Sequence, residues 1–445
     1  MKLAKPAKVG ENVMRSVILR RHSLHKRQHE MNDFSRRSFI GLLGAGALTS
    51  FTGWSPLRKE KEFRIRTITA GVELGGVTDF RTIQDARSFL ELAKGRFNGE
   101  YEVQTTRIAT QPLQRYLSSW MNEAGIKSIQ SLDELAVAAD AMFNIGPVLT
   151  QNAAVPGFGS WAADLVNATS NTSFSAFIAS ERDGVHIQSI HAAAEAITAI
   201  AHATPGGEGN FRFCATGFCP PGTPFFPAAY SDGPRSFSIG LESPRLLLAA
   251  LKGTNTKAEA AQAMRRRLDE ALAPVEALAN TISKETGWKY LGIDTSPAPG
   301  LDSSIGSVIE ALAGAPFGSP STLSACSTIT SVLQGLKAKT CGYSGLMLPV
   351  LEDQVLADRA MEGRYGVSEL LLYSSVCGTG LDVVPLAGDT PVADLARTIE
   401  DVAALSVRYQ KSLSARLFPV PGKSVGDKVD FDNPFLTQCE VMPLG

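Results

Sequence analysis

Phe63-Arg64-Ile65-Arg66-Thr67-Ile68-Thr69-Ala70-Gly71 alternates apolar and polar residues with a period of two. This alternation predicts a β-strand. A helical segment is predicted from Thr82 to Lys94, and a second strand from Glu102 to Ile108. The order of strand, helix and strand at this point sets the pattern for the rest of the chain.

The same alternation continues towards the C-terminus. Further strands are predicted at 174–179, 211–215, 236–242, 289–295, 346–350, 382–385 and 415–420. Helices are predicted near 112–123, 131–143, 188–203, 257–285, 303–313, 321–336 and 393–411. Such repetition is typical of α/β layering around a largely parallel sheet, either open or closed into a barrel. No internal sequence repeat decides between these two forms.

Length and composition are those of an enzyme-sized globular protein. The 445 residues are 44% hydrophobic and 20% charged, which are ordinary values. No Pro/Ser-rich linker or low-complexity run divides the chain, and this favours one folded domain. No uninterrupted apolar run approaches 18 residues, so the sequence predicts no membrane-spanning helix.

The N-terminal region contains a segment typical of a twin-arginine export signal. Ser35-Arg36-Arg37-Ser38-Phe39-Ile40-Gly41-Leu42-Leu43-Gly44-Ala45-Gly46-Ala47 has paired arginines, a short apolar stretch and small residues where cleavage would occur. The apolar stretch is too short to cross a bilayer of roughly 30 Å. The alternative is a basic surface helix. We expect residues 1–47 to be an extension plus signal, read by the twin-arginine translocation machinery, and the protein to be periplasmic or secreted. Either Met1 or Met31 is the start.

The charge of the chain argues against nucleic acid as a partner. Residues 1–47 carry 10 Lys and Arg against 3 Asp and Glu, although the whole chain has a net charge of −1. The remainder is therefore clearly acidic. An acidic surface repels DNA phosphates and anionic lipids, so we expect a small-molecule ligand instead. Whether copies of the chain form a homo-oligomer is left open.

Acidic residues follow several predicted strands, where α/β folds place their ligands. The candidates for acid–base catalysis are Asp294, Glu352, Asp353 and Asp382, with Cys214 as a candidate nucleophile. With Asp302 and Asp389, these acids could supply oxygen ligands for a divalent cation such as Mg²⁺ or Ca²⁺. The alternative is that they are helix N-caps and turn residues, a role that fits Glu352 and Asp353 least well. The sequence assigns no metal ligands.

A second group of residues is suited to substrate binding. Arg416 and Lys423 are candidates for holding an anion, and Gly378-Thr379-Gly380 for presenting backbone N–H groups to it. Tyr230, Glu242, Ser296 and Ser344 are further candidates from the same loops. No histidine follows His202, so a general base comes from residues 186–202 or is a carboxylate. The alternative for the glycines is a set of tight turns.

The six cysteines do not form a metal or redox motif. Cys214 and Cys219 have four residues between them, unlike the two-residue spacing of most zinc or redox pairs. In an oxidising compartment they could close a small disulfide loop. The alternative, which we favour for the other four, is a buried thiol that behaves as a small apolar group.

Several short motifs, taken in order, resemble one known family. They are Asp294-Thr295-Ser296-Pro297-Ala298-Pro299, Phe317-Gly318-Ser319-Pro320-Ser321-Thr322-Leu323, Pro349-Val350-Leu351-Glu352-Asp353, Gly380-Leu381-Asp382, Gly388-Asp389-Thr390-Pro391 and Arg416-Leu417-Phe418-Pro419-Val420-Pro421-Gly422-Lys423. This pattern resembles the domain of unknown function 711, also called uncharacterised protein family 0210, from about Arg64 to the C-terminus. The resemblance implies a pyruvate formate-lyase-like barrel of about ten strands, with surrounding helices, as a single domain over 64–445. It implies no reaction, and family members normally lack an export signal.

Glycyl-radical chemistry does not fit these residues. It requires an Arg-Val-Ser-Gly-Tyr-type loop near the C-terminus, and the last hundred residues contain none. Two function classes remain. The first is an exported enzyme that acts on a small polar or anionic molecule by carboxylate acid–base chemistry, with or without a metal. The second is a non-catalytic periplasmic binding or scaffold protein. The two are distinguished by whether the carboxylates share one cavity with Cys214 and Arg416.

Overall fold

A mostly parallel β-sheet runs through residues 62–444, the part of the chain that the computed structural model describes. These residues belong to one compact unit, Glu60–Gly445. Residues 1–61, and with them the expected export signal, lie outside the described part. The strands are β1 (Arg64–Gly71), β2 (Val103–Ala109), β3 (Met142–Leu149), β4 (Thr172–Ser180), β5 (Gly184–Val185), β6 (Phe213–Gly217), β7 (Ser236–Glu242), β8 (Lys289–Pro297), β9 (Gly380–Ala387), β10 (Leu413–Val420), β11 (Lys428–Val429) and β12 (Cys439–Glu440).

Strand directions divide this sheet into two groups. Its order is β8-β7-β1-β2-β3-β4-β6-β10-β9, with β5 paired to β4. Strands β1, β2, β3, β4 and β6 are parallel to one another. At one end of this group β7 pairs antiparallel with β1, and at the other end β10 pairs antiparallel with β6. Beyond them, β8 pairs parallel with β7, and β9 pairs parallel with β10. The predicted α/β class with a mostly parallel sheet is confirmed.

The residues after β8 run between the two edge strands. Thr340 makes a parallel bridge to Ile293 of β8, and Pro349 makes one to Asp382 of β9. The strand predicted at 346–350 is reduced to this isolated bridge and to the start of a short 3-10 helix, η3 (Val350–Glu352). The proline at position 349 lacks the N–H group that a continuous ladder needs.

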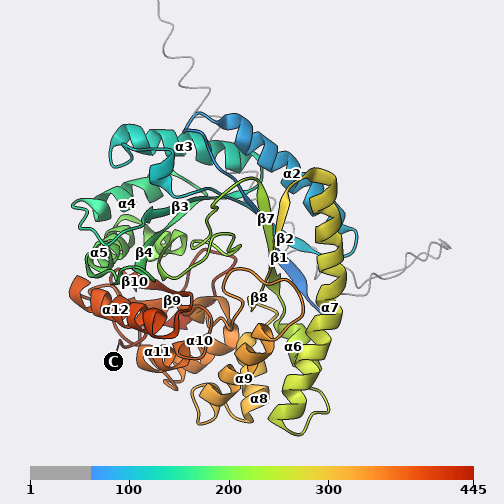
Figure 1. Ribbon diagram of the computed structural model, residues 1–445. Helices are drawn as coiled ribbons and strands as arrows, with labels where there is room; N and C mark the ends of the chain where they lie inside the picture. Colours follow the sequence, from blue (N-terminus) through green and yellow to red (C-terminus); the bar gives the residue numbers. More distant parts are fainter. Residues whose placement is uncertain (1–61, 445) are drawn as a thin grey trace, which may run out of the picture. The chain divides into compact units, whose positions relative to one another are not determined.

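Helices cover the outer face of the sheet (Figure 1). On α2 (Phe80–Asn98), Ile83, Ala86, Leu90 and Ala93 recur at helical spacing and are buried, so burial of this stripe fixes the helix on β1 and β2. The others are α3 (Glu123–Ala138), α4 (Phe158–Ala168), α5 (Ile187–Ala203), α6 (Pro244–Ala250), α7 (Lys257–Thr286), α8 (Ile305–Ala313), α9 (Thr322–Gln334), α10 (Gln354–Met361), α11 (Val367–Ser374) and α12 (Val392–Tyr409), with 3-10 helices η1 (Leu113–Arg115) and η2 (Pro205–Arg212). None of these described helices is long and apolar enough to span a bilayer.

Two predicted boundaries were wrong. Only η1 forms within the helix predicted at 112–123, and the helix predicted at 131–143 begins earlier, at Glu123, where the Asn122 side chain caps α3 by accepting from the Gly125 N–H. Strand β3 was missed, because Gly146 and Pro147 weaken the strand pattern in its sequence. Pairing with β2 and β4 on its two sides stabilises it in the fold.

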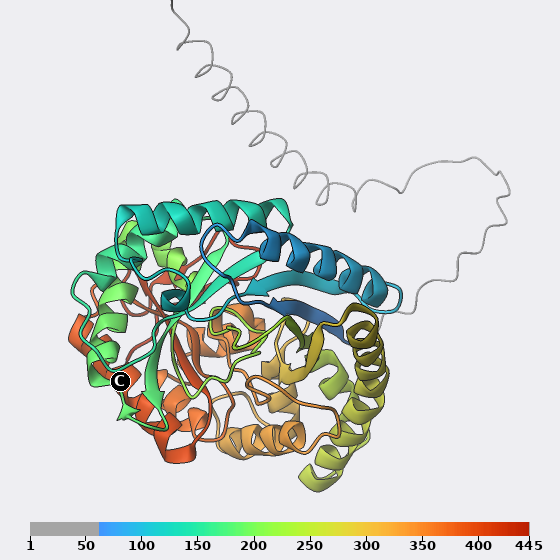
Figure 2. The ribbon, with the colours of Figure 1, turned by 45° about the horizontal axis from the view of Figure 1, so that its top comes forward.

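The loop between β6 and β7 lies against the inner face of the sheet (Figure 2). Thr69 Oγ1 of β1 donates to the carbonyl oxygen of Pro224 at 2.8 Å, and Asn144 Nδ2 of β3 donates to that of Pro227 at 2.7 Å. Phe225 of this loop packs with Ala298 and Met347. The space between this loop, the strands and the residues after β8 holds the candidate site.

Candidate functional site

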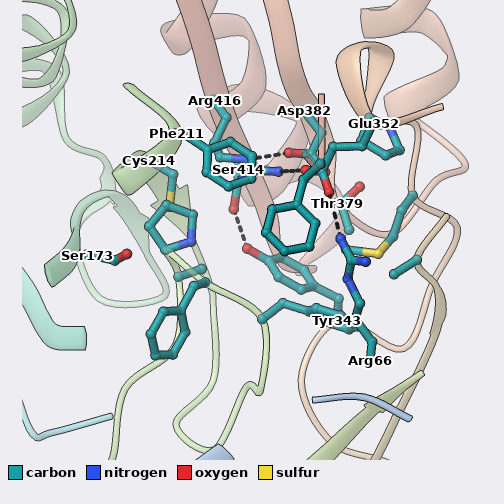
Figure 3. Close-up of a pocket in the computed structure, with 18 of the residues that line it drawn as sticks. Arg66, Ser173, Phe211, Cys214, Tyr343, Glu352, Thr379, Asp382, Ser414 and Arg416 are labelled. Carbon is teal, nitrogen blue, oxygen red and sulfur yellow. Dashed lines mark hydrogen bonds and ion pairs between the residues drawn. The ribbon is translucent and has the colours of Figure 1, made fainter. Parts of the chain in front are cut away.

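A partly open cavity of about 80 Å³ lies between the sheet and the inner loops. Strands β1, β2, β6, β9 and β10 contribute Arg66, Arg107, Cys214, Asp382 and Arg416 to its wall, and η3 contributes Glu352 (Figure 3). The volume exceeds the space that one water molecule needs. A small organic molecule is therefore the kind of ligand that the cavity fits.

Three arginines of the wall each stack on a phenylalanine from another part of the chain. The guanidinium carbon lies 5.1 Å from the ring centre of Phe435 for Arg66, 5.0 Å from that of Phe226 for Arg107, and 5.0 Å from that of Phe211 for Arg416. Stacking covers a flat face of each guanidinium and leaves its N–H edges for hydrogen bonding. The cavity thus combines oriented cations with an aromatic lining.

Glu352 and Asp382 pair with two of these arginines. Arg416 Nε donates to Asp382 Oδ1 at 2.6 Å, and Arg416 Nη2 donates to Glu352 Oε1 at 2.6 Å. The other oxygen of Glu352 accepts a hydrogen bond of 3.3 Å from Arg66 Nη2. These groups are almost entirely buried, so water does little to weaken the attraction between their charges. The arrangement fixes the direction of both carboxylates.

Strand irregularities place two of the arginines. The register between β1 and β7 shifts between Ile65 and Thr67, at Arg66. The register between β10 and β9 shifts between Ala415 and Leu417, at Arg416. A bulge turns a side chain away from the strict alternation of a regular strand. These positions explain how charged side chains enter the cavity from strands whose other residues are mostly buried.

Arg107 differs from Arg66 and Arg416 because no carboxylate pairs with it among the described residues. The residue is 7% exposed, and its Nε has no hydrogen-bond partner among residues 62–444. Its Nη1 makes a long hydrogen bond of 3.5 Å to the carbonyl oxygen of Pro224. Burial, together with the charges of Arg66 and Arg416, lowers the pKa of Arg107 to about 9, although Glu352 opposes this shift. Arg107 is therefore a buried cation without its own counterion.

Asp382, Cys214 and Tyr343 of the wall have raised pKa values. Burial raises the pKa of Asp382, with a further contribution from Glu352 that Arg416 opposes. Burial also raises the pKa of the Cys214 thiol well above its ordinary value. The Tyr343 hydroxyl forms a hydrogen bond with Ser414, which donates to Thr216 Oγ1 at 3.1 Å. Burial raises the pKa of Tyr343, which stays a neutral phenol.

The cavity brings together four of the predicted site residues, namely Cys214, Glu352, Asp382 and Arg416. Asp294 lies behind the wall, where it accepts hydrogen bonds from Ser296 Oγ and from the backbone N–H groups of Tyr343 and Ser344. Asp294 therefore holds the loop that carries Tyr343. Two serines help to hold the same loop. The Ser296 hydroxyl donates to Asp294, and the Ser344 hydroxyl donates to the Cys341 carbonyl oxygen.

Asp353 is a helix cap, contrary to our expectation from the sequence. It accepts hydrogen bonds from the backbone N–H groups of Val355 and Leu356 at the start of α10. It also accepts from Ile305 and Gly306 at the start of α8. Buried N–H groups at helix starts need such acceptors. Neighbouring Glu352 has its carboxylate in the cavity wall.

Of the remaining predicted binding residues, Thr379 lines the cavity, whereas Glu242, Tyr230 and Lys423 do not. Glu242 accepts hydrogen bonds from Arg64 and Gln104 at the outer end of β7. The Tyr230 hydroxyl donates to the Cys219 carbonyl. Lys423 is exposed beyond the end of β10. The Gly378 N–H donates to the Leu346 carbonyl, so this N–H is not available to a ligand.

Two further expectations concern metals and disulfides. Within residues 62–444, no group of three or more His, Cys, Asp or Glu residues is arranged to hold a metal ion. The candidate acids point to different partners: Asp302 to Arg64, Asp353 to helix starts and Asp382 to Arg416. Cys214 and Cys219 are both buried free thiols, so the structure has no disulfide loop between them.

Sequence reasoning missed Arg66, Arg107, Tyr343 and Ser414 as wall residues. A signal for the two arginines was present, because each lies inside a predicted strand next to apolar residues. Arginine is rarely buried unless it is paired. An arginine in a central strand therefore indicates an internal ion pair or a binding site.

The fold and the cavity define an α/β protein with an arginine-rich internal site. The chain belongs to the family described as "Uncharacterised ACR (DUF711)", whose model matches residues 57–432. It is 25% identical to a UPF0210 protein of Neisseria meningitidis over 413 residues, 86% of this chain and 91% of that protein. A UPF0210 protein of Oenococcus oeni is 25% identical over 416 residues, which are 86% of this chain and 92% of that protein. A UPF0210 protein of Pyrobaculum islandicum is 31% identical over 280 residues, which are 60% of this chain and 61% of that protein. The predicted family is confirmed.

Proposed function

We propose that this protein is an enzyme that binds a small anionic molecule in the cavity and catalyses a proton transfer on it. The observation that carries the proposal is the buried Arg107 cation, whose Nε has no partner and which lines the cavity. A buried charge without a counterion is unfavourable. An anionic ligand supplies that counterion, so the free protein is already arranged for anion binding.

Asp382 is the proposed acid–base residue. A carboxyl group whose pKa is raised towards the working pH exchanges protons with a substrate more effectively than an ordinary one. Arg416 and Glu352 fix its position. In the proposed step, a proton passes from a substrate C–H or O–H bond to the Asp382 carboxylate and is later returned. This chemistry needs no glycyl radical. In this proposal Cys214 is a neutral thiol that lines the cavity and does not act as a nucleophile.

We also propose a closed fold and a location for this enzyme. The sheet closes into a ten-stranded barrel of the pyruvate formate-lyase type, with residues 340–349 as the irregular tenth strand. The bridges from Thr340 to β8 and from Pro349 to β9 support this closure, as does the parallel order within each group of strands. The proposed location is the periplasm or beyond, supported by Ser35 to Ala47. A crystal structure tests the closure of the sheet.

Proton exchange with solvent tests the catalytic role. Pools of small organic anions are incubated with the protein in D₂O, and ¹H NMR follows solvent deuterium incorporation or new products. We expect one or more anions to react with the native protein and not with Asp382→Asn. Asp389→Asn, an exposed aspartate outside the cavity, is the control. Binding without exchange or turnover for any bound anion would instead establish the non-catalytic binding protein.

A further inference from the structure

The hydrogen-bonding edges of Arg107 restrict how a ligand binds. Its Nη1 points to the Pro224 carbonyl, whereas Nε has no partner and Nη2 makes no hydrogen bond to a described residue. Nε and Nη2 form the side-on edge of the guanidinium, which presents two parallel N–H groups. Phe226 covers a flat face of the group. A ligand therefore meets Arg107 edge-on, with two oxygen atoms in the guanidinium plane.

Each of the other cavity arginines already donates from at least one atom of its side-on edge. Arg416 donates from Nε and Nη2 to Asp382 and Glu352. Arg212 donates to the carbonyl oxygens of Thr169 and Val166 at the end of α4. Arg66 donates from Nη2 to Glu352 and from Nη1 to Gln104. Arg107 thus provides the free two-donor edge of this group.

The charged groups around Arg107 favour a ligand with one negative charge at that place. Arg416 forms ion pairs with Glu352 and Asp382. Arg66 forms ion pairs with Glu352 and with Glu242, whose Oε2 lies 3.5 Å from Arg66 Nη1. Arg107 and Arg212 donate to no described carboxylate, but the Nη groups of Arg212 already bond to backbone carbonyl oxygens, so Arg107 is the cation left for the ligand. A dianion would place its second charge close to the carboxylates of Glu352 and Asp382, where like charges repel in a medium of low polarity.

One part of the cavity wall is apolar. Phe225, Ala298 and Met347 pack together beside Tyr343, and all four line the cavity. A second polar group on the ligand would lose its hydration there without a partner. A short hydrocarbon body fits both the volume and the lining.

We infer that the ligand of this cavity is a small monocarboxylate with a short apolar body, bound through the Nε and Nη2 edge of Arg107. This inference rests on the proposed function and specifies its substrate class. The carboxylate fills the edge of Arg107, and the carbon atoms next to it lie against Phe225 and Met347.

Binding of matched probes tests the inference. Sodium propionate, its neutral analogue propionamide, sodium succinate and inorganic phosphate are added to the purified protein at equal ionic strength. Thermal unfolding and calorimetric titration report binding. We expect propionate to raise the unfolding temperature in a concentration-dependent way, and propionamide to have no effect. We expect succinate and phosphate to bind at least about tenfold more weakly than propionate.

Three variants locate the binding. Arg107→Met is expected to fold and to lose the response to propionate, because it removes a buried unpaired cation and replaces it with an apolar chain of similar length. Arg107→Lys is expected to bind propionate about tenfold more weakly, since an ammonium group lacks the two-donor edge. Arg397→Met, which removes an exposed arginine of α12 that pairs with Asp394, is the charge-matched control and is expected to bind like the native protein.

Each other result has a definite meaning. Stronger binding of phosphate or succinate, lost in Arg107→Met, overturns the monocarboxylate and leaves the proposed anion-binding function intact. Propionate binding that persists in Arg107→Met overturns the role of Arg107. Failure of all the anions to bind overturns both proposals. Propionate binding without proton exchange of any bound anion leaves this inference standing and refutes the catalytic function.

Discussion

Arg416 and Asp382 form a buried ion pair in which Nε lies 2.6 Å from Oδ1, at the point where the register between β10 and β9 shifts. Val383, next to Asp382, has a φ of +44°, a conformation that costs a β-branched residue energy. The local backbone therefore departs from a regular strand where the proposed acid–base residue enters the cavity. Arg416 also binds Glu352, so the protonation of Asp382 depends on two charged neighbours.

Replacing Glu352 by Gln should lower the pH at which Asp382 loses its proton. Burial and Glu352 raise the pKa of Asp382, whereas Arg416 lowers it. Glu352→Gln removes one raising contribution and leaves Arg416 in place, so the acidic limb of the pH–rate profile for proton exchange should move to lower pH. Glu285→Gln, at an exposed pair with Arg96, is the control. An unchanged acidic limb would show that Asp382 is not the titrating base.

Replacing Asp353 by Ala should destabilise the fold without changing anion affinity. Asp353 caps α8 and α10, and its loss leaves buried N–H groups of Ile305, Val355 and Leu356 without an acceptor. We expect a loss of about 3 kcal/mol in the free energy of unfolding, measured by urea titration. Exposed Asp389→Ala should cost little. A large loss of propionate affinity in folded Asp353→Ala would contradict the capping role.

His186 should make the folded protein less stable as the pH falls. Burial lowers its pKa, and it lies between Ser180 Oγ, 2.9 Å from Nε2, and the Phe177 carbonyl. The unfolded chain binds the proton near pH 6.5 while the folded protein stays neutral, so stability is full above that pH and declines below it.

The slope that His186 adds to the free energy of unfolding is at most about 1.4 kcal/mol per pH unit. Urea titrations between pH 5 and 8 measure it, and His186→Gln should lack this contribution. His202→Gln should retain it, because His202 is an exposed histidine in the last turn of α5, the helix that follows His186. Equal slopes in native protein and His186→Gln would refute the prediction.

Replacing both Arg36 and Arg37 by Lys should block export. The paired arginines are the recognised part of the expected signal, and lysine keeps the charge without the guanidinium groups. Cell fractionation with mass spectrometry of the N-terminus should find native protein outside the cytoplasm and the variant inside it. The double replacement Arg20→Lys and Arg21→Lys, upstream of Met31, is the matched control. Equal distribution of all three proteins would exclude the twin-arginine route.

Periodicity predicted the elements whose local pattern agrees with their place in the fold. The alternation from Phe63 to Gly71 and the helix after Thr82 were both confirmed as β1 and α2. Strand β3 failed because Gly146 and Pro147 weaken its local pattern, while pairing on both sides stabilises it. Tertiary contacts outweigh local preference at such positions.

The amino-acid sequence alone identifies the α/β class and the family, and it offers four candidate acids, of which Glu352 and Asp382 line the cavity. These follow from local pattern and from motifs, which depend only on nearby residues. Tertiary structure decides that Asp353 caps helices while Glu352 faces Arg66 and Arg416, although the two acids are adjacent in the chain. It also decides that Arg107 meets no carboxylate within the described part of the chain. The reason is that burial and ion pairing depend on which distant strands meet, and the free edge of Arg107 arises only when β1, β2, β9 and β10 enclose one cavity.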